Sequence, residues 1–114
     1  MPIRYYISLK QPEKARGSDD AFSFTAHGAP EFAAQLQATL RGDGFFQRWK
    51  QAQPDPDAVD PGLGATDPAA TVAGEQHNLQ IDLIVVTTIP GSVFKHRLRL
   101  LAGNAWELRD VSAV

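Results

Sequence analysis

Residues 78–111 constrain the fold more than any other part of this 114-residue chain. Apolar and polar residues alternate there in three runs, and residues typical of turns separate the runs at Pro90-Gly91 and at Gly103-Asn104. Alternation with a period of two is typical of strands that bury one face. The pattern therefore predicts three consecutive antiparallel strands, over residues 78–89, 93–101 and 105–111.

The N-terminal half predicts two further strands and two helices. Alternation predicts one strand over residues 2–9 and a shorter one over 22–26, after a polar loop. A helix is predicted from Pro30 to Gly42, because apolar residues recur there at a spacing of four. A second helix is predicted between Asp43 and Pro54, with an apolar stripe of Phe45, Phe46 and Trp49.

Residues 54–70 are rich in proline, aspartate and glycine, which predicts a long loop without a regular element. No change of composition divides the chain, so we expect a single domain over residues 1–114. The predicted element order is β-β-α-α-β-β-β. It favours an α+β fold in which a helical pair packs on one face of a single antiparallel sheet.

Composition argues against several classes of function. The net charge of −2 gives no attraction of the whole chain to nucleic acid, and the absence of cysteine excludes disulfides, thiolate catalysis and cysteine-type zinc sites. The three histidines are widely spaced, so we expect neither a metal site nor a cofactor. With no signal-peptide pattern and no long apolar run, a cytoplasmic protein without a membrane span is expected.

The predicted turns bring a candidate catalytic pair together. A three-residue turn over 102–104 places His96 opposite Asp110 on the inner face of the sheet. A carboxylate that fixes the tautomer of a histidine is a basic unit of general acid–base catalysis. A His–Asp pair at the end of a sheet with only a structural role is the alternative interpretation, and the commoner one.

The outer face of the predicted sheet supplies candidate partner-binding residues. Ile84 and Val86 form an apolar patch where water should face, which is typical of contact surfaces. Basic residues gather toward one end of the same face, at Lys95, Arg97, Arg99 and Arg109.

These patterns favour a small module that binds a protein or a ligand through the outer sheet face or a sheet edge, with a homodimer as one form of it. Two alternatives stay open. One is a small enzyme that uses His96 and Asp110. The other is a binder of anions or nucleic acid through the basic face, although the net charge argues against nucleic acid.

Overall fold

The computed structural model describes all 114 residues. Four strands and three helices follow one another along the chain, with short 3₁₀ turns between some of them. The order is β1 (Ile3–Leu9), α1 (Ala29–Arg41), α2 (Gly44–Gln51), β2 (Thr71–His77), β3 (Gln80–Thr87), α3 (Gly91–Ala102) and β4 (Glu107–Ala113).

The four strands form one antiparallel sheet in the order β2-β3-β1-β4. Each long connection skips one strand, since β3 lies between β1 and β2, and β1 lies between β3 and β4. Apart from α2, the element order is the β-α-β-β-α-β arrangement of split β-α-β folds. The predicted α+β class with a single antiparallel sheet is confirmed.

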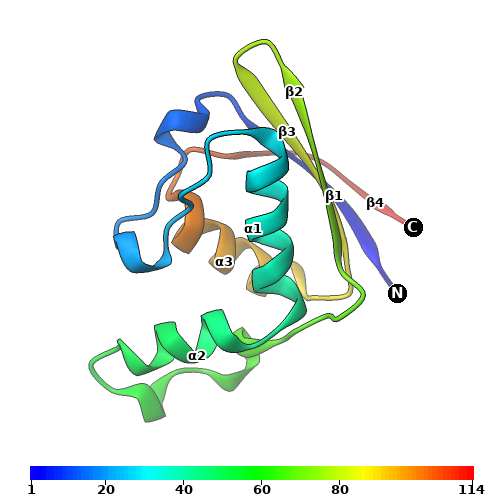
Figure 1. The fold of residues 1–114 in the computed structure, drawn as a ribbon. Helices are drawn as coiled ribbons and strands as arrows, with labels where there is room; N and C mark the ends of the chain where they lie inside the picture. Colours follow the sequence, from blue (N-terminus) through cyan, green and yellow to red (C-terminus); the bar gives the residue numbers. More distant parts are fainter.

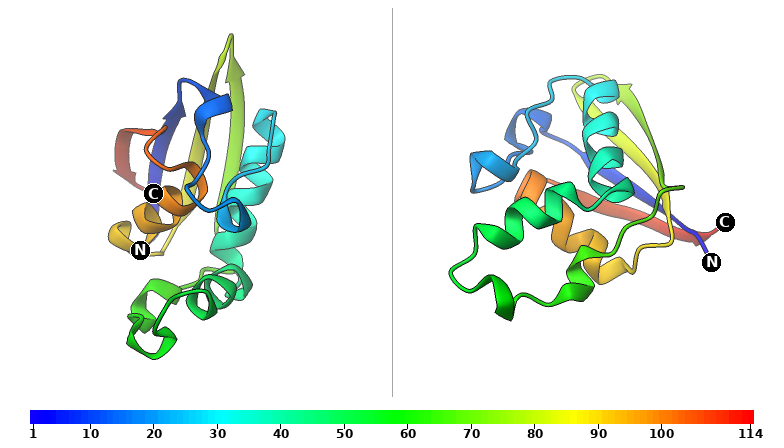
Figure 2. Two further views of the ribbon diagram at one scale, coloured as in Figure 1. Left: turned by 90° about the vertical axis from the view of Figure 1, so that its left-hand side faces the viewer. Right: turned by 60° about the horizontal axis from the view of Figure 1, so that its bottom comes forward.

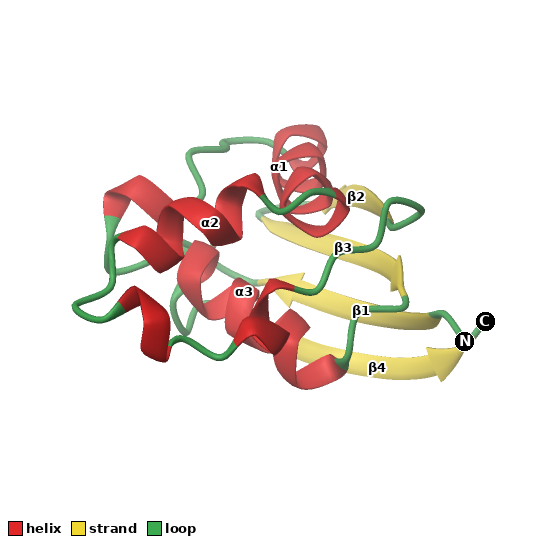
Figure 3. Cartoon of the chain, turned by 90° about the horizontal axis from the view of Figure 1, so that it is seen from below, coloured by secondary structure: helices red, strands yellow, loops and turns green.

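All three helices lie on the same side of the sheet, as Figures 1 and 3 show. Alternate residues of β1 and β3 point toward them and are buried, and the helices contribute their apolar stripes to the same core. The largest fully buried apolar side chains are Ile7, Leu9, Phe24, Phe32, Leu36, Leu40, Ile81, Leu83, Val85, Phe94 and Leu98. None of the helices has both the length and the hydropathy that a membrane span requires.

Residues 93–101 are the main difference from the sequence prediction, because they lie in helix α3 and form no strand. The buried residues of α3 include Val93, Phe94, Arg97, Leu98 and Leu101, which share one face at the helical period. The helix begins after Pro90 and ends before Gly103, whose φ of 63° is suited to glycine. The predicted strand pairings across residues 93–101, including that of His96 with Asp110, are therefore wrong.

Two other segments differ from the prediction. Residues 22–26 form no strand: a 3₁₀ turn covers Asp20–Phe22, and the extended chain beyond it inserts Phe24 into the core. The backbone N–H of Phe24 donates to the carbonyl of Leu101, so this segment binds the end of α3 and has no strand partner. Strand β2, which the sequence did not predict, forms a hairpin with β3.

Residues 54–70 form the predicted loop, with two short 3₁₀ turns, and side-chain and backbone hydrogen bonds hold it to the rest of the fold. The N–H of Asp67 donates to Leu40 at 2.7 Å, and its buried carboxylate accepts the hydroxyl of Thr87 and the N–H of Thr88. The buried guanidinium of Arg97 donates to the carbonyls of Leu63 and Ala65. Figure 2 shows this loop returning beneath α2 toward the sheet.

The two ends of the chain lie side by side at one end of the sheet (Figure 1), because β1 and β4 are neighbours. The N–H of Val114 donates to the carbonyl of Pro2 at 3.4 Å.

Candidate functional site

The face of the sheet that points away from the helices, here called the open face, is covered by no other element (Figures 1 and 3). The registers of the three strand pairs place alternate residues of all four strands on it. They are Arg4, Tyr6 and Ser8 of β1, Thr71, Ala73, Glu75 and His77 of β2, Gln80, Asp82, Ile84 and Val86 of β3, and Glu107, Asp110 and Ser112 of β4.

Apolar side chains occupy the middle of the open face. Tyr6 pairs with Ile84, Ile84 pairs with Ala73, and Val86 lies two residues further along β3. We call these four residues the apolar centre. Tyr6, Ile84 and Val86 are only half-buried, because their shielding comes from neighbouring side chains of the same face. An uncovered apolar group framed by polar residues is a feature of contact surfaces.

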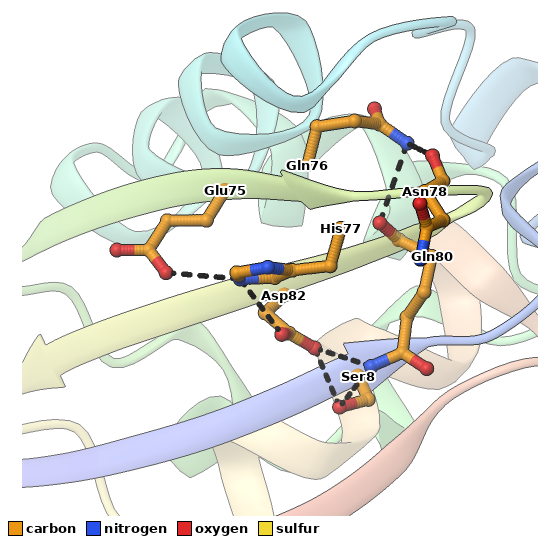
Figure 4. Close-up of polar contacts among 7 residues, drawn as sticks. All are labelled: Ser8, Glu75, Gln76, His77, Asn78, Gln80 and Asp82. Carbon is orange, nitrogen blue, oxygen red and sulfur yellow. Dashed lines mark hydrogen bonds and ion pairs between the residues drawn. The ribbon is translucent and has the colours of Figure 1, made fainter.

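A network of polar side chains occupies the end of the open face nearest the β2–β3 hairpin (Figure 4). The Ser8 hydroxyl donates to Asp82 Oδ1 at 2.7 Å, and Gln80 Nε2 donates to the same oxygen at 2.9 Å. His77 Nε2 lies 3.4 Å from Asp82 Oδ2 and 3.3 Å from Glu75 Oε2. We call these five residues the polar cluster. Asp82 is its centre, since three of the other four contact its carboxylate.

The surroundings of Asp82 favour its charged form. Burial raises the pKa of Asp82, but hydrogen bonds from Ser8 and Gln80, together with the charges of His77 and Arg109, outweigh burial and leave the pKa below its usual value. The carboxylate is therefore ionised at neutral pH and is a weak base.

The polar cluster contains a serine, a histidine and an aspartate, but not in the order that nucleophilic catalysis requires. In a catalytic triad the hydroxyl donates to the imidazole, which removes the proton. Here the hydroxyl of Ser8 donates to the carboxylate of Asp82, and His77 contacts the other oxygen of that carboxylate. These contacts fix the side chains at this end of the face and favour a charged Asp82, but they do not activate Ser8 as a nucleophile.

A shallow hollow of about 380 Å³ lies on the open face over the polar cluster and extends to β4. Carboxylates of Glu75, Asp82 and Asp110 line it, with Arg109 as the one cation. No group of three or more histidine, aspartate or glutamate side chains is placed to hold a metal ion. The hollow is thus an acidic surface suited to a cationic side chain.

The structure does not bring the predicted catalytic pair together. His96 lies on α3, where its ring packs edge-on against Trp49 with 4.8 Å between the ring centroids. Burial and the charges of Arg99 and Arg97 lower the pKa of His96. Asp110 lies on the open face beside Tyr6, on the opposite side of the sheet from α3.

The predicted partner-binding residues separate into two groups. Ile84 and Val86 lie on the open face, where the alternation placed them, and Arg109 lines the hollow there. Lys95, Arg97 and Arg99 lie on α3, so no basic sheet face assembles. Arg97, whose side chain was predicted to face solvent, is 2 % exposed.

Sequence reasoning missed the polar cluster and the role of Tyr6 in the apolar centre. Ser8 and Asp82 are 74 positions apart and meet only because β1 pairs with β3. The local signals were two pairs, Glu75 with His77 and Gln80 with Asp82, whose spacing of two places the side chains of each pair on one face of a strand.

Three comparisons with known proteins, against family models, curated proteins and solved structures, found no match to this chain.

Proposed function

We propose that this protein is an interaction module whose open face binds a second copy of the chain. The observation that carries the proposal is the apolar centre, which lies uncovered in the middle of a regular sheet and is framed by charged residues. Specific interfaces have this layout, with an apolar core inside a polar rim.

The charges of the open face favour one arrangement of the two copies. Arg4 lies at one end of β1, and Ser8, beside Asp82 and Glu107, lies about 13 Å away at the other end. A twofold axis that crosses the strands at Tyr6 would place Arg4 of each copy over the acidic end of the other. It would also place Tyr6, Ala73 and Ile84 of the apolar centre on the same residues of the other copy, as an isologous contact requires.

The size of the open face indicates a weak, reversible dimer. Four strands of about seven residues span roughly 19 Å by 23 Å, so the flat area is about 440 Å² per copy. Even with the relief of the side chains, two copies would bury an area near the lower limit of specific interfaces, which is about 1,200 Å² in total. We expect dissociation in the micromolar range.

Sedimentation velocity over protein concentrations of about 5 to 500 µM tests the proposal. The wild-type protein should shift from monomer to dimer within this range. Ile84→Asp should stay monomeric throughout, because the buried charge would lie in the middle of the contact without a partner.

Ala34→Asp is the matched control, since it adds the same charge at an exposed position of α1 away from the sheet. It should dimerise as the wild type does. A wild-type protein that stays monomeric at 500 µM, or an Ile84→Asp variant that dimerises normally, would contradict the proposal.

A further inference from the structure

A second hollow, here called the hairpin cleft, lies on the helical side of the sheet and is independent of the open face. It has a volume of about 590 Å³, which is within the usual range for small-molecule sites. The cleft lies between the tip of the β2–β3 hairpin, the chain that follows β1, and the beginning of α1, all of which meet at the upper end of the molecule in Figure 1.

Core residues lie directly beneath the hairpin cleft. Ala26, Phe32 and Ile81 line its bottom but expose 1 % of their surface or less, so a ligand reaches little of them. Leu79 lines the cleft from the hairpin tip and is 86 % exposed. A leucine so exposed at the tip of a hairpin, where polar residues are usual, gives the cleft an apolar wall that an apolar ligand would cover.

The rim of the cleft carries more positive than negative charge. Lys10 and Arg16 line it, and Glu13 is the only acidic residue that does. Lys10 also forms an ion pair with Glu107, with 3.3 Å between Nζ and Oε1. Both side chains are about half exposed, so this ion pair is weak and an anionic ligand could replace Glu107.

Arg16 is held in place and has no carboxylate partner. Its guanidinium donates to the carbonyls of Ala15 and Ala26 and lies 5.7 Å from the centre of the Phe32 ring. A guanidinium has five N–H donors, so two hydrogen bonds to carbonyls leave donors for an anion. Arg16 therefore presents a fixed positive charge to the cleft.

We infer that the hairpin cleft binds a small amphipathic anion, with its apolar body against Leu79 and a carboxylate at Arg16. The planar fork of an arginine matches the two oxygens of a carboxylate. Apolar surface together with a few convergent polar groups is the usual composition of a ligand site.

Titration of the ¹⁵N-labelled protein with octanoate, followed by NMR, tests this inference. The amide signals of residues 10–16, 26–32 and 76–81 should shift together and saturate. Octan-1-ol and octylamine have the same apolar chain without the negative charge, and each should bind at least tenfold more weakly. Equal affinity for octanoate and octan-1-ol, or shifts that map elsewhere, would overturn the inference.

Substitutions at the rim test the assignment of the carboxylate position. Arg16→Gln should weaken octanoate binding about tenfold, because it removes the fixed charge. Glu13→Gln should strengthen binding about threefold, because it removes a like charge. Lys14→Gln is the matched control on the same 3₁₀ turn, since Lys14 does not line the cleft, and it should bind as the wild type does.

Leu79→Asn keeps the test valid if Arg16→Gln fails to fold. Leu79 is exposed at the hairpin tip, so its replacement should leave the fold intact and weaken octanoate binding about fivefold. Wild-type affinity in both Leu79→Asn and Glu13→Gln would overturn the inference. The dimer of the open face should be unaffected by all of these substitutions.

Discussion

Arg97 is the most unusual residue of the core, because it is a buried cation with no acidic partner. Its guanidinium donates to the carbonyl of Thr39 at the end of α1, at 3.0 Å, and to the carbonyls of Leu63 and Ala65 in the loop. Burial lowers the pKa of this guanidinium. Carbonyl dipoles take the place of a counter-ion here, and one side chain joins α3, α1 and the loop.

We predict that Arg97→Met lowers the free energy of unfolding by about 3 kcal/mol, because the buried carbonyl of Thr39 and the part-buried carbonyls of Leu63 and Ala65 lose their donor. Urea denaturation followed by circular dichroism measures the change. Arg99→Met is the matched control, since Arg99 is exposed on the same helix, and it should change stability by less than about 0.5 kcal/mol. Equal effects of the two substitutions would contradict the role given to Arg97.

Asp67 makes the stability of the protein depend on pH. Hydrogen bonds from the N–H of Thr88, which outweigh the opposing effect of burial, and from Thr87 and Ala69 hold the pKa of Asp67 below its usual value of 3.8. A carboxylate with a lowered pKa in the folded state stabilises the fold fully above its unfolded-state pKa. That stabilisation is lost as the pH falls through the folded-state pKa.

The free energy of unfolding should therefore decrease as the pH is lowered from 5 to 2, and less steeply in Asp67→Asn. Thermal unfolding at a series of pH values measures both slopes. Asp60→Asn replaces an exposed loop aspartate and should keep the wild-type slope. If Asp67→Asn also kept that slope, another carboxylate would be responsible.

At the scale of the elements, the sequence was sufficient to predict a helix or a strand where its apolar residues followed a single period. The alternation of β1 and β3 and the spacing of four in α1 identified these elements, and alternation alone placed Ile84 and Val86 on the face away from the helices. In α3 two periods compete. Phe94, His96, Leu98 and Leu100 alternate like a strand, whereas the residues that are actually buried repeat at the helical period.

Tertiary packing decides whether residues 93–101 follow the helical or the strand period. That packing cannot be deduced from a single sequence. Pro90 and Gly103 are compatible with the ends of a helix as well as with the turns of a meander. Strand β2 is mostly polar and forms because β3 and α1 lie against it. The polar cluster could not be predicted, since it requires the pairing of β1 with β3.

The contact between α1 and β2 depends on Gly74. A Cβ at this position would lie 2.4 Å from the carbonyl oxygen of Ala29, at the beginning of α1. We predict that Gly74→Ala lowers the free energy of unfolding by about 2–3 kcal/mol, because the backbone of the helix must move.

Gly42→Ala is the matched control for Gly74→Ala, because a Cβ at Gly42 would meet nothing within 4 Å. Its φ of −137° is accessible to alanine, so stability should stay the same or rise by up to about 1 kcal/mol. Chemical denaturation of both variants compares them directly. A neutral Gly74→Ala would mean that α1 and β2 are less tightly packed.

The whole molecule has two layers, a layer of helices and a sheet, and the sheet is covered on one side only (Figures 1 and 3). The helices hide one face of the sheet, and the apolar centre of the other face stays exposed to water. Association through that face would stabilise the folded state by mass action.

We therefore predict that the midpoint of thermal unfolding rises with protein concentration in the wild type and stays constant in Ile84→Asp. Differential scanning calorimetry at about 10 and 500 µM measures the difference. Arg4→Glu should also weaken this dependence, since it would place like charges at both ends of the contact. If the Arg4→Glu variant behaves as the wild type, the placement of Arg4 over the acidic end of the other copy is contradicted, although the dimer itself is not.

The neighbouring positions of Pro2 and Val114 have a consequence for protein engineering. A short glycine linker could join them, and new termini could be opened between Pro54 and Asp60 without interrupting any strand or long helix. Such a circular permutant would carry its ends far from the sheet, so that a fluorescent label attached there would leave both proposed binding surfaces unobstructed.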